Sequence, residues 1–125
     1  VSKNDVRNAK NSLGLPDKRY AEILPNGQIV LQMEDNFIDC GEVICRGEKN
    51  FSLEGWFNIQ EKQNQAENYA WMIIQRESIN RFLFFPESYI WWGDTGVNRI
   101  RITNLGTESL LLDAVIGYGM KSKGG

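Results

Sequence analysis

The sequence has no histidine and only two cysteines among its 125 residues. Without histidine, the chain cannot build a Ser-His-Asp or Cys-His nucleophile, nor a His-ligated zinc site. Two cysteines are also too few for a Cys₄ metal site. Sixteen acidic residues could still supply a carboxylate pair for glycoside hydrolysis. A domain of 125 residues has little room for a deep cleft, however, and we expect the protein not to be an enzyme.

The sequence also lacks a large excess of either charge and has no long apolar run. Fourteen basic and sixteen acidic residues give a net charge of -2, and like charges are interspersed rather than grouped. The basic stripe typical of nucleic-acid-binding proteins is absent, so we expect no nucleic-acid partner. No apolar run approaches the ~18–20 residues of a membrane-spanning helix, so we expect no membrane span.

The two cysteines, Cys40 and Cys45, lie close together in the sequence. Along an extended strand they would be roughly 16 Å apart, whereas the Cα atoms of a disulfide are ~4.4–6.8 Å apart. A disulfide would therefore need a tight turn at Gly41. Three alternatives stay open: a disulfide, two buried thiols and a reactive cysteine.

Apolar residues recur mainly with a period of two, which is typical of β-strands. Within residues 51–59, Phe51, Leu53 and Phe57 share one face, and Trp56 lies on the other. Turn signals separate such segments at intervals of about 8–12 residues, which indicates an antiparallel β-sandwich or barrel. The expected strands include residues 28–33, 51–59, 69–75, 81–85, 88–92, 97–103 and 110–118.

Two segments depart from this pattern. Residues 3–13 can hold one or two helical turns before Gly14 and Pro16 end them. Residues 60–68 are polar, and we expect an exposed loop there. No linker or internal repeat divides the chain, so we predict a single β-sandwich domain over residues 1–125.

The first part of the chain contains a series of short motifs that can be compared with known domains. Asn8-Ala9 precedes Ser-Leu-Gly-Leu-Pro-Asp at residues 12–17, and the segments 27–33 and 37–44 continue the pattern. These segments resemble the opening of discoidin-like, galactose-binding-type jelly-roll domains.

The end of the chain resembles the same family. Residues 98–104 read Asn-Arg-Ile-Arg-Ile-Thr-Asn, and residues 112–116 read Leu-Asp-Ala-Val-Ile. Lys18 and Glu42 stand where the family usually has Gly and Asp, and residues 49–95 do not match. The resemblance implies an all-β antiparallel jelly roll of about eight strands. It also implies a non-catalytic, carbohydrate-binding module of a secreted or cell-surface bacterial protein, located outside the cell or on its surface.

Asp113 stands in an otherwise apolar segment, so its carboxylate needs a partner if it is buried. In many jelly-roll modules the corresponding Asp helps to hold a structural Ca²⁺, and the resemblance implies Asp113 and Asp17 as ligands of such an ion. The alternative is that Asp113 faces solvent or accepts hydrogen bonds from Arg or backbone donors. Asp17 can also bond nearby backbone amides in an Asx turn.

Trp91 and Trp92 are adjacent, so in a strand only one of them can enter the core. Tyr89 and Asp94 flank the pair. Sugars are recognised by aromatic rings that stack on their C–H faces, with polar side chains bonding the hydroxyl groups. We therefore predict a carbohydrate-binding platform at Tyr89, Trp91, Trp92 and Asp94. The alternative is that one tryptophan packs beneath residues 60–68.

Two other strands carry similar mixed faces. Trp56 shares its face with Glu54 and Asn58, and Trp71 shares one with Tyr69 and Gln75. We include Trp56 among the expected ligand-binding residues.

Arg76 and Arg81 flank a polar hairpin tip and could clamp an anion, or they could be solvated or paired with nearby glutamates. A function of a different class also fits the aromatic content. The chain could be a protein-interaction or structural module whose exposed aromatics bury in a neighbouring domain or a second copy.

Overall fold

The computed structural model describes residues 5–14, 16–32, 36–37, 40–58, 66, 68–78, 82–85, 97–118 and 121–122. Its larger sheet consists, in spatial order, of β1 (Val6–Arg7), β2 (Ala21–Ile23), β11 (Leu110–Tyr118), β5 (Cys40–Gly47), β9 (Phe82–Phe85) and β8 (Gln75–Ser78). Its smaller sheet consists of β3 (Gln28–Gln32), β10 (Arg99–Asn104), β6 (Phe51–Asn58) and β7 (Tyr69–Ile73). A short pair, β4 (Asn36–Phe37) and β12 (Lys121–Ser122), and a 3₁₀ helix over Ala9–Ser12 complete the described elements.

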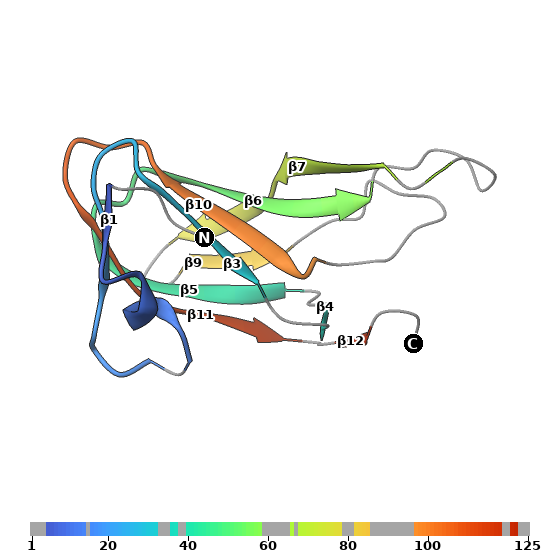
Figure 1. Cartoon of the computed structure of the whole chain (residues 1–125), viewed down its shortest axis with the longest axis horizontal. Coiled ribbons are helices and arrows are strands. Elements are labelled where there is room, and N and C mark those ends of the chain that lie inside the picture. The colour runs from blue at the N-terminus through green and yellow to red at the C-terminus, as the bar shows by residue number, and fades with distance from the viewer. Residues whose placement is uncertain are drawn as a thin grey trace.

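The two sheets pack face to face, and all their described strand pairs are antiparallel. In Figure 1, β10 and β6 run above β5 and β11. Side chains from both sheets share one hydrophobic core. The expected all-β sandwich is therefore confirmed. Among the described residues, no helix is long and apolar enough to cross a membrane.

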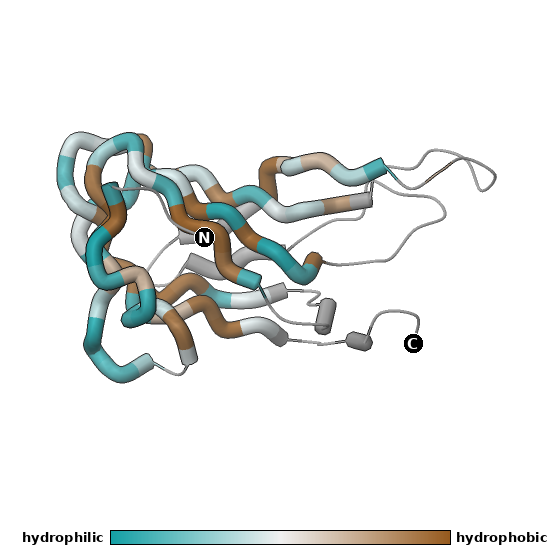
Figure 2. The backbone as a smooth tube through the Cα atoms, viewed as in Figure 1, coloured by the Kyte–Doolittle hydropathy of each residue, from teal (hydrophilic) through white to brown (hydrophobic). Residues whose placement is uncertain are grey.

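The period-two pattern assigns the core face correctly. Phe51, Leu53 and Phe57 on β6 are buried, and so are Ile100 and Ile102 on β10. Arg101, between the two isoleucines of β10, points outward, and Figure 2 shows the alternation of brown and teal along that strand. The faces of these two strands are set by the local sequence, because successive side chains of a strand point to opposite sides.

The expected strand over residues 69–75 is wrong in one respect. The chain leaves β7 at Ile73 and enters β8 at Gln75, and these strands belong to different sheets. Ile74 lies between them with its side chain in the core, and its N–H donates to the carbonyl of Leu53 at 2.9 Å. A buried corner residue therefore carries the chain from one layer to the other, and an alternating pattern gives no signal of that change.

The remaining expected strands, helical turns and loop agree with the structure to different extents. The segment 110–118 matches β11 at both ends, and the helical turns expected over residues 3–13 shorten to the 3₁₀ helix. The strand over residues 88–92 lies outside the described residues, as does most of the loop over 60–68. Cys40 and Cys45 share the continuous strand β5, so the turn at Gly41 that a disulfide between them would need does not occur.

Asn104 and Glu48 organise the end of the sandwich where β5 turns into β6 and β10 turns into β11. Asn104, at the end of β10, is fully buried, and its amide bonds the backbone of Ile23 in the larger sheet and of Gly106 and Glu108 in the turn between β10 and β11. The Glu48 carboxylate accepts four backbone N–H donors. These are Lys49 at 3.0 Å, Asn50 at 3.1 Å, Thr107 at 2.8 Å and Glu108 at 3.2 Å. One side chain thus ties the two turns together.

These backbone donors, that of Asn50 first and that of Glu108 next, lower the pKa of Glu48. Because the folded chain favours the ionised carboxylate, the contribution of Glu48 to stability is complete above the unfolded pKa of about 4.3. That contribution is lost as the pH falls through the lowered folded pKa. We expect Glu48→Gln to be less stable than wild type at pH 7, with a difference that shrinks toward pH 3 in urea denaturation. The control is Glu108→Gln, an exposed side chain in the turn between β10 and β11, which should leave stability at pH 7 within about 0.5 kcal/mol of wild type. A Glu48→Gln difference that is the same at pH 7 and pH 3 would contradict this role.

Candidate functional site

Three aromatic side chains gather on the outer face of the smaller sheet. In the register of β6 and β7, Trp56 pairs with Trp71, and Asn58 pairs with Tyr69. Positions 69 and 71 therefore lie on the same face as Trp56, opposite to the buried Phe57. Trp56, Tyr69 and Trp71 are each partly exposed. We call these three side chains the aromatic platform.

The platform is built by two different ring contacts. The rings of Trp56 and Tyr69 are nearly parallel, at 13°, with centroids 6.0 Å apart. Since stacked rings lie roughly 3.5–4 Å apart, this separation means that the two rings are displaced sideways and cover each other only in part. Trp71 lies 5.1 Å from Trp56 at an angle of 58°. The result is a broad aromatic surface with one ring tilted against the other two.

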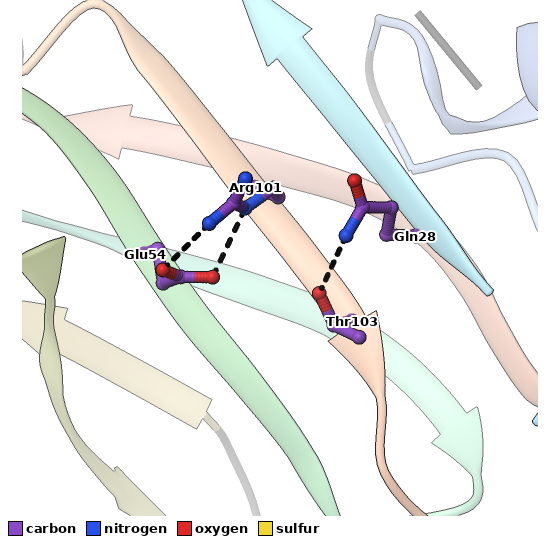
Figure 3. A network of polar contacts seen from close by, with 4 residues as sticks. All are labelled: Gln28, Glu54, Arg101 and Thr103. Carbon is purple, nitrogen blue, oxygen red and sulfur yellow. Dashed lines mark hydrogen bonds and ion pairs between the residues drawn. The ribbon is translucent and has the colours of Figure 1, made fainter. Parts of the chain in front are cut away.

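An ion pair lies beside the platform. Arg101 on β10 pairs in register with Glu54 on β6, and both side chains point outward (Figure 3). The Arg101 Nε donates to Glu54 Oε1 at 3.0 Å, and its Nη2 donates to Oε2 at 2.8 Å. The guanidinium carbon also lies 4.6 Å from the centroid of the Trp71 ring. The carboxylate and the aromatic ring together hold Arg101 in one orientation, since a bidentate pair and a cation–π contact both depend on the direction of the guanidinium plane.

The polar surface continues along β10 beyond the ion pair. Thr103 on β10 accepts a hydrogen bond from the Gln28 amide of β3 at 3.4 Å, as Figure 3 shows. One face of the smaller sheet therefore carries aromatic rings, a donor and acceptor pair held in one orientation, and further polar side chains. Such a face can stack on a ring-shaped ligand and bond its polar groups at the same time.

The structure separates the other predicted ligand-binding residues from this face or does not describe them. Tyr89, Trp91, Trp92, Asp94 and Arg81 lie outside the described residues. Arg76 lies on β8 in the larger sheet, and its side chain is not described. Trp56 is the member of the predicted set that the structure places in an aromatic cluster.

The Asp113 side chain lies against the backbone of residues 17 and 18. A β-bulge in β11 falls at Asp113, whose carboxylate is buried. Its Oδ1 accepts the N–H of Asp17 and its Oδ2 accepts the N–H of Lys18, both at 3.1 Å. The Asp17 carboxylate accepts the N–H of Arg19 at 2.9 Å, which is the expected Asx-type contact.

Two backbone N–H donors thus satisfy the buried Asp113 carboxylate. The arrangement does not itself create a cation site. Within the described residues, no group of three or more acidic or cysteine side chains lies close enough together to hold a metal ion. The donor set seen at Asp113 therefore adds no support for calcium, and structural calcium stays a prediction of the family resemblance.

The sequence alone does not bring these residues together. It predicts a mixed face for Trp71 and Tyr69 on their own strand and places Glu54 beside Trp56, but nothing in it pairs β6 with β7 or Arg101 with Glu54. The sequence feature that could indicate the Arg101–Glu54 pair is the outward position of opposite charges on two strands. Such charges favour cross-strand pairing once the strands are known to be neighbours.

Searches of protein-family models, curated proteins and solved structures found no match for the chain. The likeness to discoidin-like domains therefore stays a resemblance in motifs. We infer function from the chemistry of the platform and its ion pair.

Proposed function

We propose that the protein is a non-catalytic carbohydrate-binding module that binds sugar rings on the outer face of its smaller sheet. The observation that carries this proposal is the aromatic platform beside the fixed Glu54–Arg101 pair. An aromatic ring face suits the C–H face of a pyranose, and the carboxylate and guanidinium suit its hydroxyl groups. Partial exposure of all these side chains fits a shallow site for a glycan chain.

We also propose a more specific fold and location for this module. A sandwich of two antiparallel sheets, together with the motifs at both ends of the chain, supports a discoidin-like jelly roll. A module of this kind would be part of an extracellular or cell-surface protein. This step rests on likeness of fold and motif, whereas the binding proposal rests on the side chains themselves.

The test is a glycan titration by calorimetry with wild type and Trp71→Ala. Removing Trp71 takes away one ring of the platform and the surface on which Arg101 rests, so we expect affinity to fall by about tenfold or more. The matched control is Tyr20→Ala, since Tyr20 also packs under an arginine, with the Arg46 guanidinium carbon 5.8 Å from its ring centroid, but lies outside the platform. Tyr20→Ala should keep wild-type affinity.

The rival function is a protein-interaction or structural module, and one observation favours it. Ile73 on β7 is 69 % exposed and pairs with Glu54 in the sheet register, so it borders the platform. An exposed apolar side chain on an edge strand suits a protein partner. Concentration-dependent self-association of wild type, with no heat of binding across a broad glycan panel, would overturn the carbohydrate proposal in favour of this one.

A further inference from the structure

The Glu54–Arg101 pair leaves the platform with hydrogen-bonding capacity but little charge. Arg101 has five N–H donors, and Glu54 takes one from Nε and one from Nη2, so about three remain. Each Glu54 oxygen accepts one of these bonds and retains further acceptor capacity. The pair therefore offers donors and acceptors together, which is the pattern that a hydroxyl group needs.

The charges around the platform are few. The described outward-facing side chains of the smaller sheet include three charged groups, namely Glu54, Arg101 and Arg99. Glu54 and Arg101 cancel each other at 2.8 Å, with side chains only 18 % and 24 % exposed. Arg99 is exposed to solvent at the start of β10, where water and salt screen its charge.

We propose that Glu54 makes the site selective for uncharged sugars over uronate or sulfated ones. The inference rests on the proposed function and names its ligand class. Without Glu54, the guanidinium held over Trp71 would be a ready partner for a carboxylate or sulfate. With Glu54 in place, an anionic group has to displace that carboxylate or lie against it, and like charges repel.

The experiment compares wild type with Glu54→Gln, which keeps the shape of the side chain and removes its charge. The probes are neutral cello- and galacto-oligosaccharides and the uronate oligomers of the same length, titrated at low and at physiological salt. Wild type should prefer the neutral oligomers by about tenfold or more. Glu54→Gln should gain about tenfold in uronate affinity, and that gain should weaken as salt is added.

Two further variants make the result specific to the pair. Arg99→Gln removes a charge from the same face but leaves the pair intact, so the neutral preference should persist. Arg101→Gln leaves the Glu54 carboxylate without its cation, so uronate binding should weaken further. This variant keeps the test decisive if Glu54→Gln folds poorly.

The possible results distinguish a failure of the proposed selectivity from a failure of carbohydrate binding itself. Wild type that binds uronates as well as neutral oligomers, or a Glu54→Gln variant that gains no uronate affinity, overturns the selectivity while leaving carbohydrate binding in place. Wild type that binds none of the oligosaccharides overturns both.

Discussion

Replacing Asn104 by alanine should lower the free energy of unfolding by roughly 3–5 kcal/mol, because each buried backbone group left without a partner costs about 1–3 kcal/mol. The Asn104 amide donates to the carbonyls of Ile23 at 2.9 Å and Glu108 at 2.6 Å. Its Oδ1 accepts the N–H of Gly106 at 2.8 Å. The bond to Ile23 joins the two layers, because Ile23 belongs to the larger sheet and Asn104 to the smaller one, and the other two bonds hold the turn between β10 and β11.

Urea denaturation of purified Asn104→Ala is the direct measurement, with a melting temperature expected to fall by roughly 10–20 °C. Asn50→Ala is the matched control. Asn50 is exposed, and its amide makes a long 3.4 Å bond to the carbonyl of Leu105, so its loss should change stability by less than about 0.5 kcal/mol. A loss below about 1 kcal/mol for Asn104→Ala would show that the amide is not the inter-sheet link that the contacts indicate.

Replacing Gly55 by valine should destabilise the protein by about 3 kcal/mol, although strand propensity alone would favour the β-branched residue. Gly55 lies on β6 between Glu54 and Trp56 and faces the core. A Cβ there would lie 2.7 Å from Val97 Cγ1, 2.9 Å from a ring carbon of Phe57 and 3.0 Å from Ile74 Cδ1. These contacts are too close, so β6 or its neighbours must shift.

Because Gly55 lies between Glu54 and Trp56, two residues of the proposed binding face, the shift should also weaken the proposed glycan binding. Ser52→Val is the control, since Ser52 is on the same strand, faces outward and gains a similar side chain without entering the core. It should leave stability within about 0.5 kcal/mol of wild type. Equal urea midpoints for Gly55→Val and Ser52→Val would refute the packing argument.

The candidate binding site could be predicted only in part from the sequence. The sequence predicts an outward face for Trp56, opposite to the apolar side of its strand, and the structure places Trp56 in the aromatic platform. The sequence gives no signal for Arg101, because the orientation of its side chain depends on Glu54, which is 47 residues away. The predicted site at Tyr89, Trp91, Trp92 and Asp94 stays a prediction, since these residues lie outside the described part of the chain.

The sequence by itself determined the class of fold and which side chains of β6 and β10 face the core. This is possible because the alternation of side chains along a strand is a local property of the backbone. It also determined the exclusion of histidine-based chemistry.

Only the tertiary structure decided which strands are neighbours and in what register. It brought Arg101 to Glu54 and Trp71 to Trp56, turned the chain from one sheet to the other at Ile74, and bonded Asp113 to the N–H of Asp17. Strand partners are chosen by packing and hydrogen bonding between distant segments, and a one-residue change of register would move every side chain to the opposite face. The proposed binding face depends on that choice, because its aromatic rings and its ion pair come from three different strands.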